Sequence, residues 1–187
     1  DRNAQVVNRT AVVLSLTVAL MLVLTASMTL AGGTHQFSFV SSQSDAPGAG
    51  VIPTGGSENV TYSVPSNGVL PVMVFLEPTS EDIEVSPNDL YVSGGATANA
   101  TVTLHAPPQT GFYRRYIVEH RYLAILPNTT IRALYGLHPW APILAIDFLL
   151  GGGFLAFAIA FVGLGRTRIR SRGRDISLQN RIRKWLR

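Results

Sequence analysis

The sequence predicts an all-β, immunoglobulin-like antiparallel sandwich outside the cytoplasm, flanked by two transmembrane α-helices, a short interfacial helix and a basic C-terminal helix. Two long apolar runs, a middle region of short β-rich runs, and an uneven distribution of arginine predict this arrangement. The predicted parts are a cytoplasmic N-terminus (1–10), a first transmembrane helix (11–33), an extracytoplasmic β-sandwich (34–126), an interfacial helix or elbow (127–141), a second transmembrane helix (142–165) and a basic amphipathic cytoplasmic tail (166–187).

The two apolar runs are long enough to cross a bilayer. The run from Ala11 to Gly33 contains no charged residue, and the run from Pro142 to Gly165 contains only Asp147. About 20 apolar residues in a helix span the hydrocarbon of a membrane. A signal peptide is the alternative for the first run, but the run exceeds the usual apolar core of ~7–15 residues. We therefore expect two spans.

Charge predicts the orientation of these spans. Residues 34–141 carry eight acidic residues and four arginines, whereas residues 166–187 carry nine basic residues and one aspartate. Because loops rich in Lys and Arg stay in the cytoplasm, both termini are expected inside and the middle region outside, in an integral protein of the cell membrane or envelope. The net charge of +4 therefore indicates the lipid bilayer as a partner and does not indicate nucleic acid.

Seven short β-rich runs lie between the spans, separated by Gly, Pro, Ser and Asn. In residues 97–105 every second residue from Ala98 to Leu104 is apolar, as in a strand with one face on a core. Seven short strands within ~100 residues fit an immunoglobulin-like sandwich. Residues 41–56 have little apolar surface and are expected to form a loop. The predicted strands are His35–Ser42, Glu58–Val64, Leu70–Glu77, Asp82–Ser86, Asp89–Val92, Thr97–His105 and Phe112–Ile125.

The last of these runs, TGFYRRYIVEHRYLAILP (110–127), concentrates aromatic and charged residues. In a strand its even-numbered residues from 112 to 122 share one face, and its odd-numbered residues from 113 to 123 share the other. Arg115 and Arg121 flank Glu119 on the second face, so that face carries partly compensated charge and no basic strip for phosphate. The predicted partner-contact residues are Arg114, His120 and Tyr122.

The segment after this strand is expected to lie along the outer membrane surface as an elbow. Asn128 or Thr129 is the predicted N-cap of a short helix, and Trp140 suits the headgroup layer. Three Asn-x-Thr sequons on the external side make their asparagines candidates for N-glycosylation. These asparagines are Asn59, Asn99 and Asn128.

The residues provide no catalytic constellation, and no catalytic, cofactor or metal-binding residue is predicted. The external region has no lysine, which excludes a Ser/Lys dyad, and none of the four histidines lies in a nucleophile-elbow context. The acidic run 77–85 lacks the spacing of a calcium-binding loop. The chain has no cysteine for disulfides or thiolate chemistry.

Two further features concern the spans and the tail. Asp147 is an intramembrane polar residue one turn into the second span, where headgroups, water or Arg132 are within reach. The glycines at 151–153 would admit the first helix closely. In the tail, apolar residues spaced as one helical stripe lie beside basic ones, which favours a helix on the inner leaflet over a disordered basic tail. The expected inner-leaflet anchors are Arg181, Arg183, Lys184, Trp185 and Arg187.

The phrases ENVTYSVPSNGVLPVMVFLEP, GFYRRYIVEHRYLAILP and LYGLHPWAPILAIDFLLGGG, within residues 35–155, resemble the C-terminal membrane half of type I signal-peptidase-like proteins of halophilic archaea. In those proteins a Ser/His/Asp peptidase domain precedes this half and cleaves leader peptides from exported proteins. The Gly-Asp and Ser-Met-x-Pro phrases of that domain have no counterpart in this chain. The resemblance therefore implies a non-catalytic half and transfers no catalytic residue.

The expected function is that of a non-catalytic, membrane-anchored accessory or partner-binding module, with a protein partner at the outer membrane face and no cofactor. Two alternatives remain open at this point. The chain is part of a signal peptidase whose catalytic domain is missing here, so that any enzymatic role comes by association only, or it is a structural component of a cell surface or viral envelope.

Overall fold

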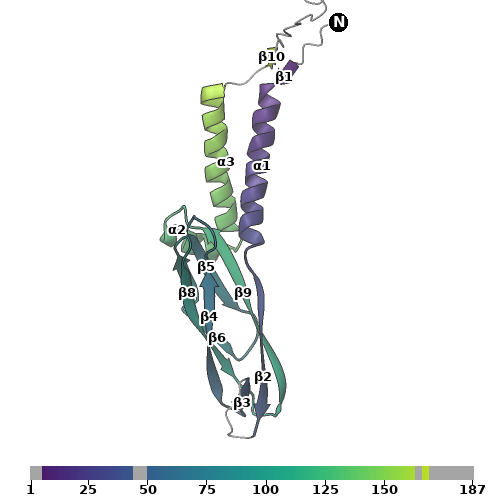
Figure 1. Cartoon of the computed structure of the whole chain (residues 1–187), viewed down its shortest axis with the longest axis vertical. Helices are drawn as coiled ribbons and strands as arrows, with labels where there is room; N and C mark the ends of the chain where they lie inside the picture. The colour runs from purple at the N-terminus through teal and green to yellow at the C-terminus, as the bar shows by residue number, and fades with distance from the viewer. Residues whose placement is uncertain (1–5, 44–49, 163–165, 169–187) are drawn as a thin grey trace, which may run out of the picture.

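The computed structural model describes residues 6–43, 50–162 and 166–168. Two long helices, α1 (Arg9–Thr29) and α3 (Ala141–Val162), lie side by side at one end of an elongated β-sandwich (Figure 1). Both are long and apolar enough to cross a membrane, and only 17% and 28% of their most apolar windows are buried. This exposure is unlike that of a helix in the core of a soluble domain.

The sandwich consists of a five-stranded sheet, in the order β3-β2-β9-β5-β7, and a three-stranded sheet, in the order β4-β8-β6. All pairings are antiparallel except that of β2 with β3, and all seven predicted strands are present. The strands are β2 (Gly33–Ser42), β3 (Val51–Pro53), β4 (Ser57–Pro65), β5 (Val72–Pro78), β6 (Ile83–Ser86), β7 (Asp89–Val92), β8 (Thr97–His105) and β9 (Gly111–Leu123).

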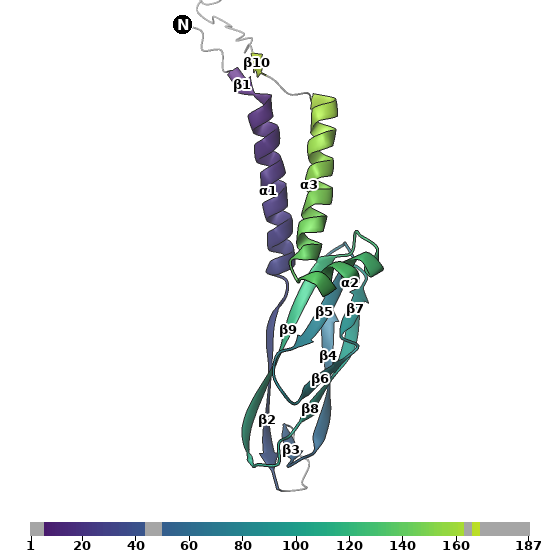
Figure 2. The same ribbon diagram turned by 180° about the vertical axis from the view of Figure 1, so that it is seen from behind.

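The strand directions define a helix-proximal end and a helix-distal end of the sandwich. β2 follows α1 after three residues and runs away from the helices, and β9 returns beside it toward α3. The views from both sides show β2 and β9 side by side along the length of the domain (Figures 1 and 2). Both connections to the helices therefore leave the same end of the sandwich.

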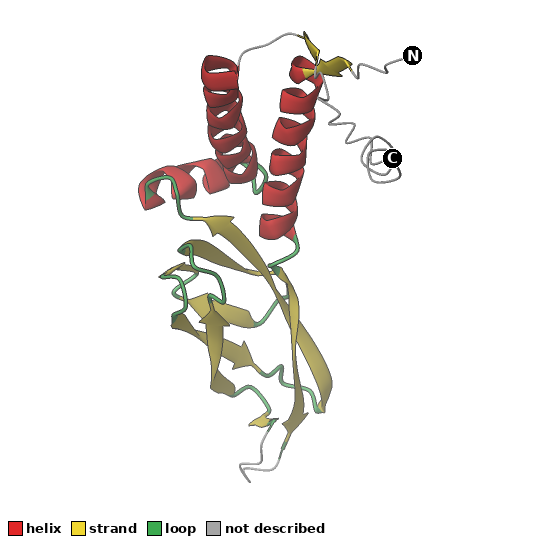
Figure 3. Cartoon of the chain, turned by 45° about the horizontal axis from the view of Figure 1, so that its top comes forward, coloured by secondary structure: helices red, strands yellow, loops and turns green. Residues whose placement is uncertain are grey.

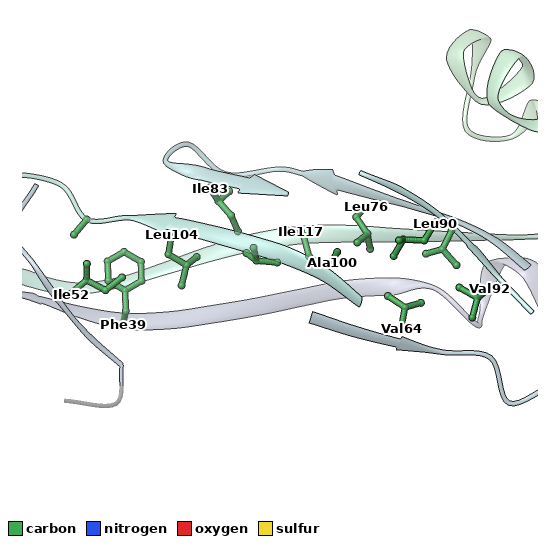
Figure 4. Packing of buried hydrophobic residues seen from close by; sticks show 13 residues of the cluster. Phe39, Ile52, Val64, Leu76, Ile83, Leu90, Val92, Ala100, Leu104 and Ile117 are labelled. Atoms are coloured by element: carbon green, nitrogen blue, oxygen red, sulfur yellow. The ribbon is translucent and has the colours of Figure 1, made fainter. Parts of the chain in front are cut away.

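The apolar core lies between the two sheets. It consists of inward-facing side chains from both sheets, such as Phe39, Ile117 and Leu104, packed in one layer (Figure 4). The predicted alternation of β8 is confirmed, because Ala100, Val102 and Leu104 are buried. With no cysteine in the chain, this apolar burial stabilises the sandwich without disulfides.

The expected loop at 41–56 is wrong in one part. Val51–Pro53 form β3, which pairs in parallel with β2, and Ile52 is only 1% exposed in the core. The polar composition of the whole segment concealed two adjacent apolar residues, which are sufficient for a three-residue edge strand. β5 also begins at Val72 and not at Leu70, so that Leu70 lies in the preceding loop.

A third sheet, of two strands, lies at the far ends of the long helices. β1 (Val6–Asn8) pairs antiparallel with β10 (Arg166–Arg168), which follows α3 (Figure 3). This pairing joins segments at opposite ends of the sequence. It was not predicted, since neither segment has an alternating apolar pattern.

The short helix α2 (Asn128–Leu137) lies across the helix-proximal end of the sandwich (Figures 2 and 3). The predicted N-cap is wrong, because the cap residue is Pro127 and no side chain caps the helix. The amides of Thr130 and Ile131 donate to the Pro127 carbonyl at 2.9 and 3.1 Å. The helix therefore begins one residue earlier than its Asn/Thr cap signal indicates.

Candidate functional site

Glu119 on β9 is a buried carboxylate at the helix-proximal end of the sandwich, with only 2% of its surface exposed. The Tyr62 hydroxyl on β4 donates to Glu119 Oε2 at 2.6 Å, and His35 Nε2 on β2 lies 3.3 Å from the same oxygen. Arg121 Nε donates to Oε1. Three neighbours from three strands therefore surround one carboxylate, and we call these four residues the Glu119 cluster.

The Glu119 cluster links the two sheets. Glu119 belongs to the five-stranded sheet and Tyr62 to the three-stranded sheet, and Arg121 Nη1 also donates to the Pro65 carbonyl at 2.7 Å at the end of β4. Burial, and then the hydrogen bond to Glu119, raise the pKa of Tyr62, so its phenol remains a proton donor. A buried carboxylate is tolerated only when it is paired and hydrogen-bonded, as it is here.

On the opposite face of β9, apolar side chains join the sandwich to all three helices. Tyr122 is 1% exposed, and its hydroxyl donates to the Pro139 carbonyl at 2.7 Å. The rings of Phe75 and Tyr135 stack with centroids 4.0 Å apart. The buried members of this junction cluster are Met28, Met73, Phe75, Tyr122, Ile131, Ile143 and Ile146.

The junction cluster predicts a loss of stability at alkaline pH. Burial, and then the charge of Glu77, raise the pKa of Tyr135 from 10.0 to about 12. A raised tyrosine pKa contributes stability below pH 10.0, and this contribution is lost as the pH rises through the folded pKa of about 12. We expect Tyr135→Phe to flatten the decline in unfolding free energy between these pH values. Denaturant titrations of the full chain in detergent at several alkaline pH values measure this, and parallel declines would contradict it.

A pocket of about 270 Å3 lies between the end of α1, the first residues of β2, β9 and the start of α3. Its lining includes Met28, Thr34, His120, Trp140 and Ile143. Apolar side chains thus meet hydroxyl and imidazole groups at the level where α1 ends and α3 begins. With Glu119 and Arg121 also in the lining, this composition suits a small amphipathic group.

The predicted partner-contact residues do not form one site. Arg114 is exposed near the helix-distal end, where its guanidinium lies 5.4 Å from the centroid of the Phe112 ring. His120 is six residues further along the strand, about 20 Å away, and its imidazole lies 3.5 Å from Glu77. Tyr122 is buried in the junction cluster, so its prediction as a partner contact is wrong.

Three further acidic residues of the sandwich pair with separate basic partners and do not converge. Asp82 accepts from Arg115 at 2.9 Å, Glu84 lies 3.7 Å from His105, and Asp89 accepts from Arg132. Within the described ranges, no group of three or more His, Asp or Glu residues is placed to hold a metal ion. Arg115 therefore forms its ion pair with Asp82 and not with Glu119, which it was expected to flank.

Asp147 joins the two long helices. Its Oδ2 accepts from the Thr25 hydroxyl of α1, and Asp147 is 8% exposed. Arg132, one of three neighbours predicted to be within reach of Asp147, pairs with Asp89 on β7. Gly151 lies against Met21 of α1, as the glycine run predicted, whereas Gly152 and Gly153 face open space.

The glycines of α3 provide a matched test of helix packing. A Cβ at Gly151 would lie 2.5 Å from Met21 Cε, whereas a Cβ at Gly152 has no neighbour within 4 Å. We expect Gly151→Leu to reduce stability by about 1–3 kcal/mol through overpacking and Gly152→Leu to change it little. Thermal unfolding of the full chain in detergent measures both variants. Equal losses would show that the interface at Gly151 is not tightly packed.

The three sequons lie in different surroundings. Asn59 on β4 and Asn99 on β8 are exposed on the outer face of the three-stranded sheet, and Asn59 Oδ1 accepts from Thr103 at 2.8 Å. Asn128 is half-buried at the first residue of α2. The expected inner-leaflet anchors at 181–187 lie outside the described residues.

The sequence identified Glu119 and Arg121 as neighbours but missed the other members of the Glu119 cluster. His35 lies opposite Ile117 in the register of β2 with β9, and Tyr62 belongs to the other sheet. A glutamate surrounded by apolar and aromatic residues on a core face was the one available signal. Its partners come from other strands, and Tyr62 is 57 residues away from Glu119 in the sequence.

No protein-family model matches the chain, and no curated protein matches its sequence. Among solved structures, SSP-19, an MSP-domain protein like family member in Caenorhabditis elegans, aligns at 13% identity and a TM-score of 0.37, covering 45% of this chain and 77% of that chain. WR4, a C. elegans MSP family member, aligns at 15% identity and 0.32, covering 49% and 75%. PapD-like domain 7 of human CEP192 aligns at 11% identity and 0.32, covering 37% and 62%.

Proposed function

We propose that the chain is a non-catalytic, membrane-anchored accessory module that presents a partner-binding sandwich at the outer membrane face. The observation that carries this proposal is that both apolar helices leave the same end of the sandwich and share one apolar cluster with it. A domain whose first and last strands both lead into membrane helices is held in a fixed orientation at the bilayer. The positive C-terminal segment supports an orientation with both termini in the cytoplasm.

The sequence supports a non-catalytic role, because none of the four histidines lies in a nucleophile-elbow context and residues 34–141 contain no lysine for a Ser/Lys dyad. In the structure, His35, His105 and His120 each lie beside a glutamate, and His138 Nδ1 accepts from the Trp140 amide at 3.1 Å.

The partner is proposed to bind the helix-distal half of the outer face of the five-stranded sheet. There Val40 and Phe112 pair across β2 and β9 and are 40% and 60% exposed, and Arg114 follows beside Ser38. The corresponding face of the three-stranded sheet carries Thr, Ser and Asn on β4 and β8. An aromatic ring beside an arginine is typical of the residues that dominate protein interfaces.

Single cysteines test the topology, because the chain has none of its own. A membrane-impermeant maleimide applied to intact cells is expected to label Ser63→Cys on β4 and to leave Ser171→Cys in the tail unlabelled until the cells are lysed. The reverse pattern would overturn the orientation.

A photo-crosslinking amino acid at Phe112 tests the partner surface, with the same group at Thr101 on the other sheet as the control. We expect a discrete adduct from position 112 that Arg114→Glu weakens, and no adduct from position 101. Equal adducts at both positions would contradict the surface. Cleavage of leader peptides by the purified chain would contradict the non-catalytic role.

A further inference from the structure

We propose that the loop between β4 and β5 inserts Val69 and Leu70 into the outer headgroup layer, so that the sandwich rests directly on the bilayer. Val69 is 96% exposed and Leu70 is 52% exposed, and they are adjacent in the loop 66–71. This proposal rests on the membrane anchoring proposed above. It adds a contact with lipid made by the sandwich itself.

Hydrogen bonds hold this loop at the helix-proximal end. The Ala124 amide donates to the Pro71 carbonyl at 2.9 Å, three residues before Pro127 caps α2. The Ser66 amide donates to the Ala96 carbonyl at 2.8 Å, and the Gly95 amide donates to the Ser66 carbonyl at 2.9 Å. The loop is therefore braced on both sides at the level of α2, from which the chain continues into α3.

The backbone of the loop also packs closely against the backbone at Gly94. A Cβ at Gly94 would lie 2.1 Å from the Val69 carbonyl oxygen, so the absence of a side chain at position 94 allows the two backbones to meet. Ser66 is buried at 4% exposure. A braced backbone presents the two apolar side chains outward with little entropy left to lose on insertion.

The loop itself is uncharged, and the charged residues near it are paired. The segments 66–71, 93–96, 124–131 and 133–146 contain no Asp, Glu, Lys or Arg. Arg132 of α2 pairs with Asp89, and Arg121, which donates to the Pro65 carbonyl beside the loop, pairs with Glu119. Leu137 and Trp140, on the elbow into α3, are 80% and 50% exposed. Apolar and aromatic side chains next to the ends of two apolar helices match the interfacial layer of a bilayer.

Lipid is the occupant favoured by these observations because the loop lies at the end of the sandwich from which both long apolar helices leave. Leu30, at the end of α1, is 83% exposed, and α3 begins directly after Trp140. Because the loop 66–71 carries no charge, we expect its contact with the bilayer to be insensitive to the content of anionic lipid. Glu81 and Asp82 lie in the turn after β5, which runs away from the helices, and Asp82 pairs there with Arg115.

The test uses the full chain in phosphatidylcholine nanodiscs that each contain one copy. A polarity-sensitive fluorophore is attached to single cysteines at Val69→Cys, at Glu58→Cys on the distal part of β4, and at Phe157→Cys, a 60% exposed position of α3. A lipid with a nitroxide near its headgroup quenches a label within the interface. Quenching at position 69 is expected to exceed that at position 58 by at least about threefold, because interfacial side chains lie within roughly 5–10 Å of the headgroup and acyl boundary.

Each outcome decides something different. Quenching at position 157 by an acyl-chain nitroxide, with none at 69, would overturn the insertion of the loop and leave the anchoring intact. No quenching at position 157 would overturn the anchoring and this proposal with it. A label at 69 that is shielded from iodide but not quenched by lipid would mean that protein covers the loop, which also overturns the proposal.

A substitution provides an independent readout. Leu70→Asp, in the chain labelled at position 69, is expected to reduce the quenching to the level of position 58, because a carboxylate resists transfer into the interface. Leu70 is half-exposed, and thermal unfolding in detergent is expected to stay within a few degrees of the parent. Unchanged quenching would count against insertion.

Discussion

Replacing Glu119 with alanine is expected to destabilise the full chain by about 3–5 kcal/mol. The change removes the acceptor of the Tyr62 hydroxyl. It also leaves the Arg121 guanidinium without its carboxylate partner, at a position where the glutamate is only 2% exposed. Breaking one member of a buried pair leaves the other charge uncompensated. Denaturant unfolding in detergent, followed by the circular dichroism of the sheets, measures the loss.

Two controls separate this effect from the general cost of losing a carboxylate. Glu58→Ala removes an exposed carboxylate from β4 and is expected to change stability by about 0.5 kcal/mol or less. Adding Arg121→Met to Glu119→Ala is expected to restore part of the loss, because the uncompensated cation is removed. If Glu119→Ala costs no more than Glu58→Ala, the Glu119 cluster does not link the sheets in the way described.

Gly32→Ala is expected to cost about 3 kcal/mol, because overpacking here involves two backbones. A Cβ at Gly32 would lie 2.2 Å from the carbonyl oxygen of Glu119, in the segment that joins α1 to β2. Relief requires β2 to move away from β9, which disturbs the ladder that begins at Gly33. Thermal unfolding of the full chain and proteolysis near the junction measure this displacement.

The matched control for Gly32 is Gly136→Ala in α2, where a Cβ has no neighbour within 4 Å. There the substitution is expected to stabilise the chain by about 0.4–1 kcal/mol, since alanine restricts the unfolded chain and favours the helix. Opposite signs for the same chemical change would establish that the space at Gly32 is what matters. A loss at Gly136 equal to that at Gly32 would contradict the close approach.

Local patterns in the sequence were enough to predict seven of the ten described strands and the two long helices. The alternation of apolar residues in β8 and the turn residues between strands are visible over five to ten residues, and the strands lie where these patterns indicate. The uninterrupted apolar runs similarly predicted α1 and α3. The N-cap prediction for α2 failed because the Pro127 carbonyl accepts the first helical hydrogen bonds, so that Asn128 and Thr129 lie within the helix.

The stretch 110–127 shows where sequence reasoning ended. The sequence by itself determined that this stretch is a long strand with mixed faces and that Glu119 and Arg121 compensate each other. Only the tertiary structure decided that Tyr62 completes the Glu119 cluster from the other sheet, that Tyr122 is buried against the helices, and that Val69 and Leu70 are left exposed. Periodicity reports which face a side chain takes along its own strand, whereas these contacts depend on which distant segments are packed against that face.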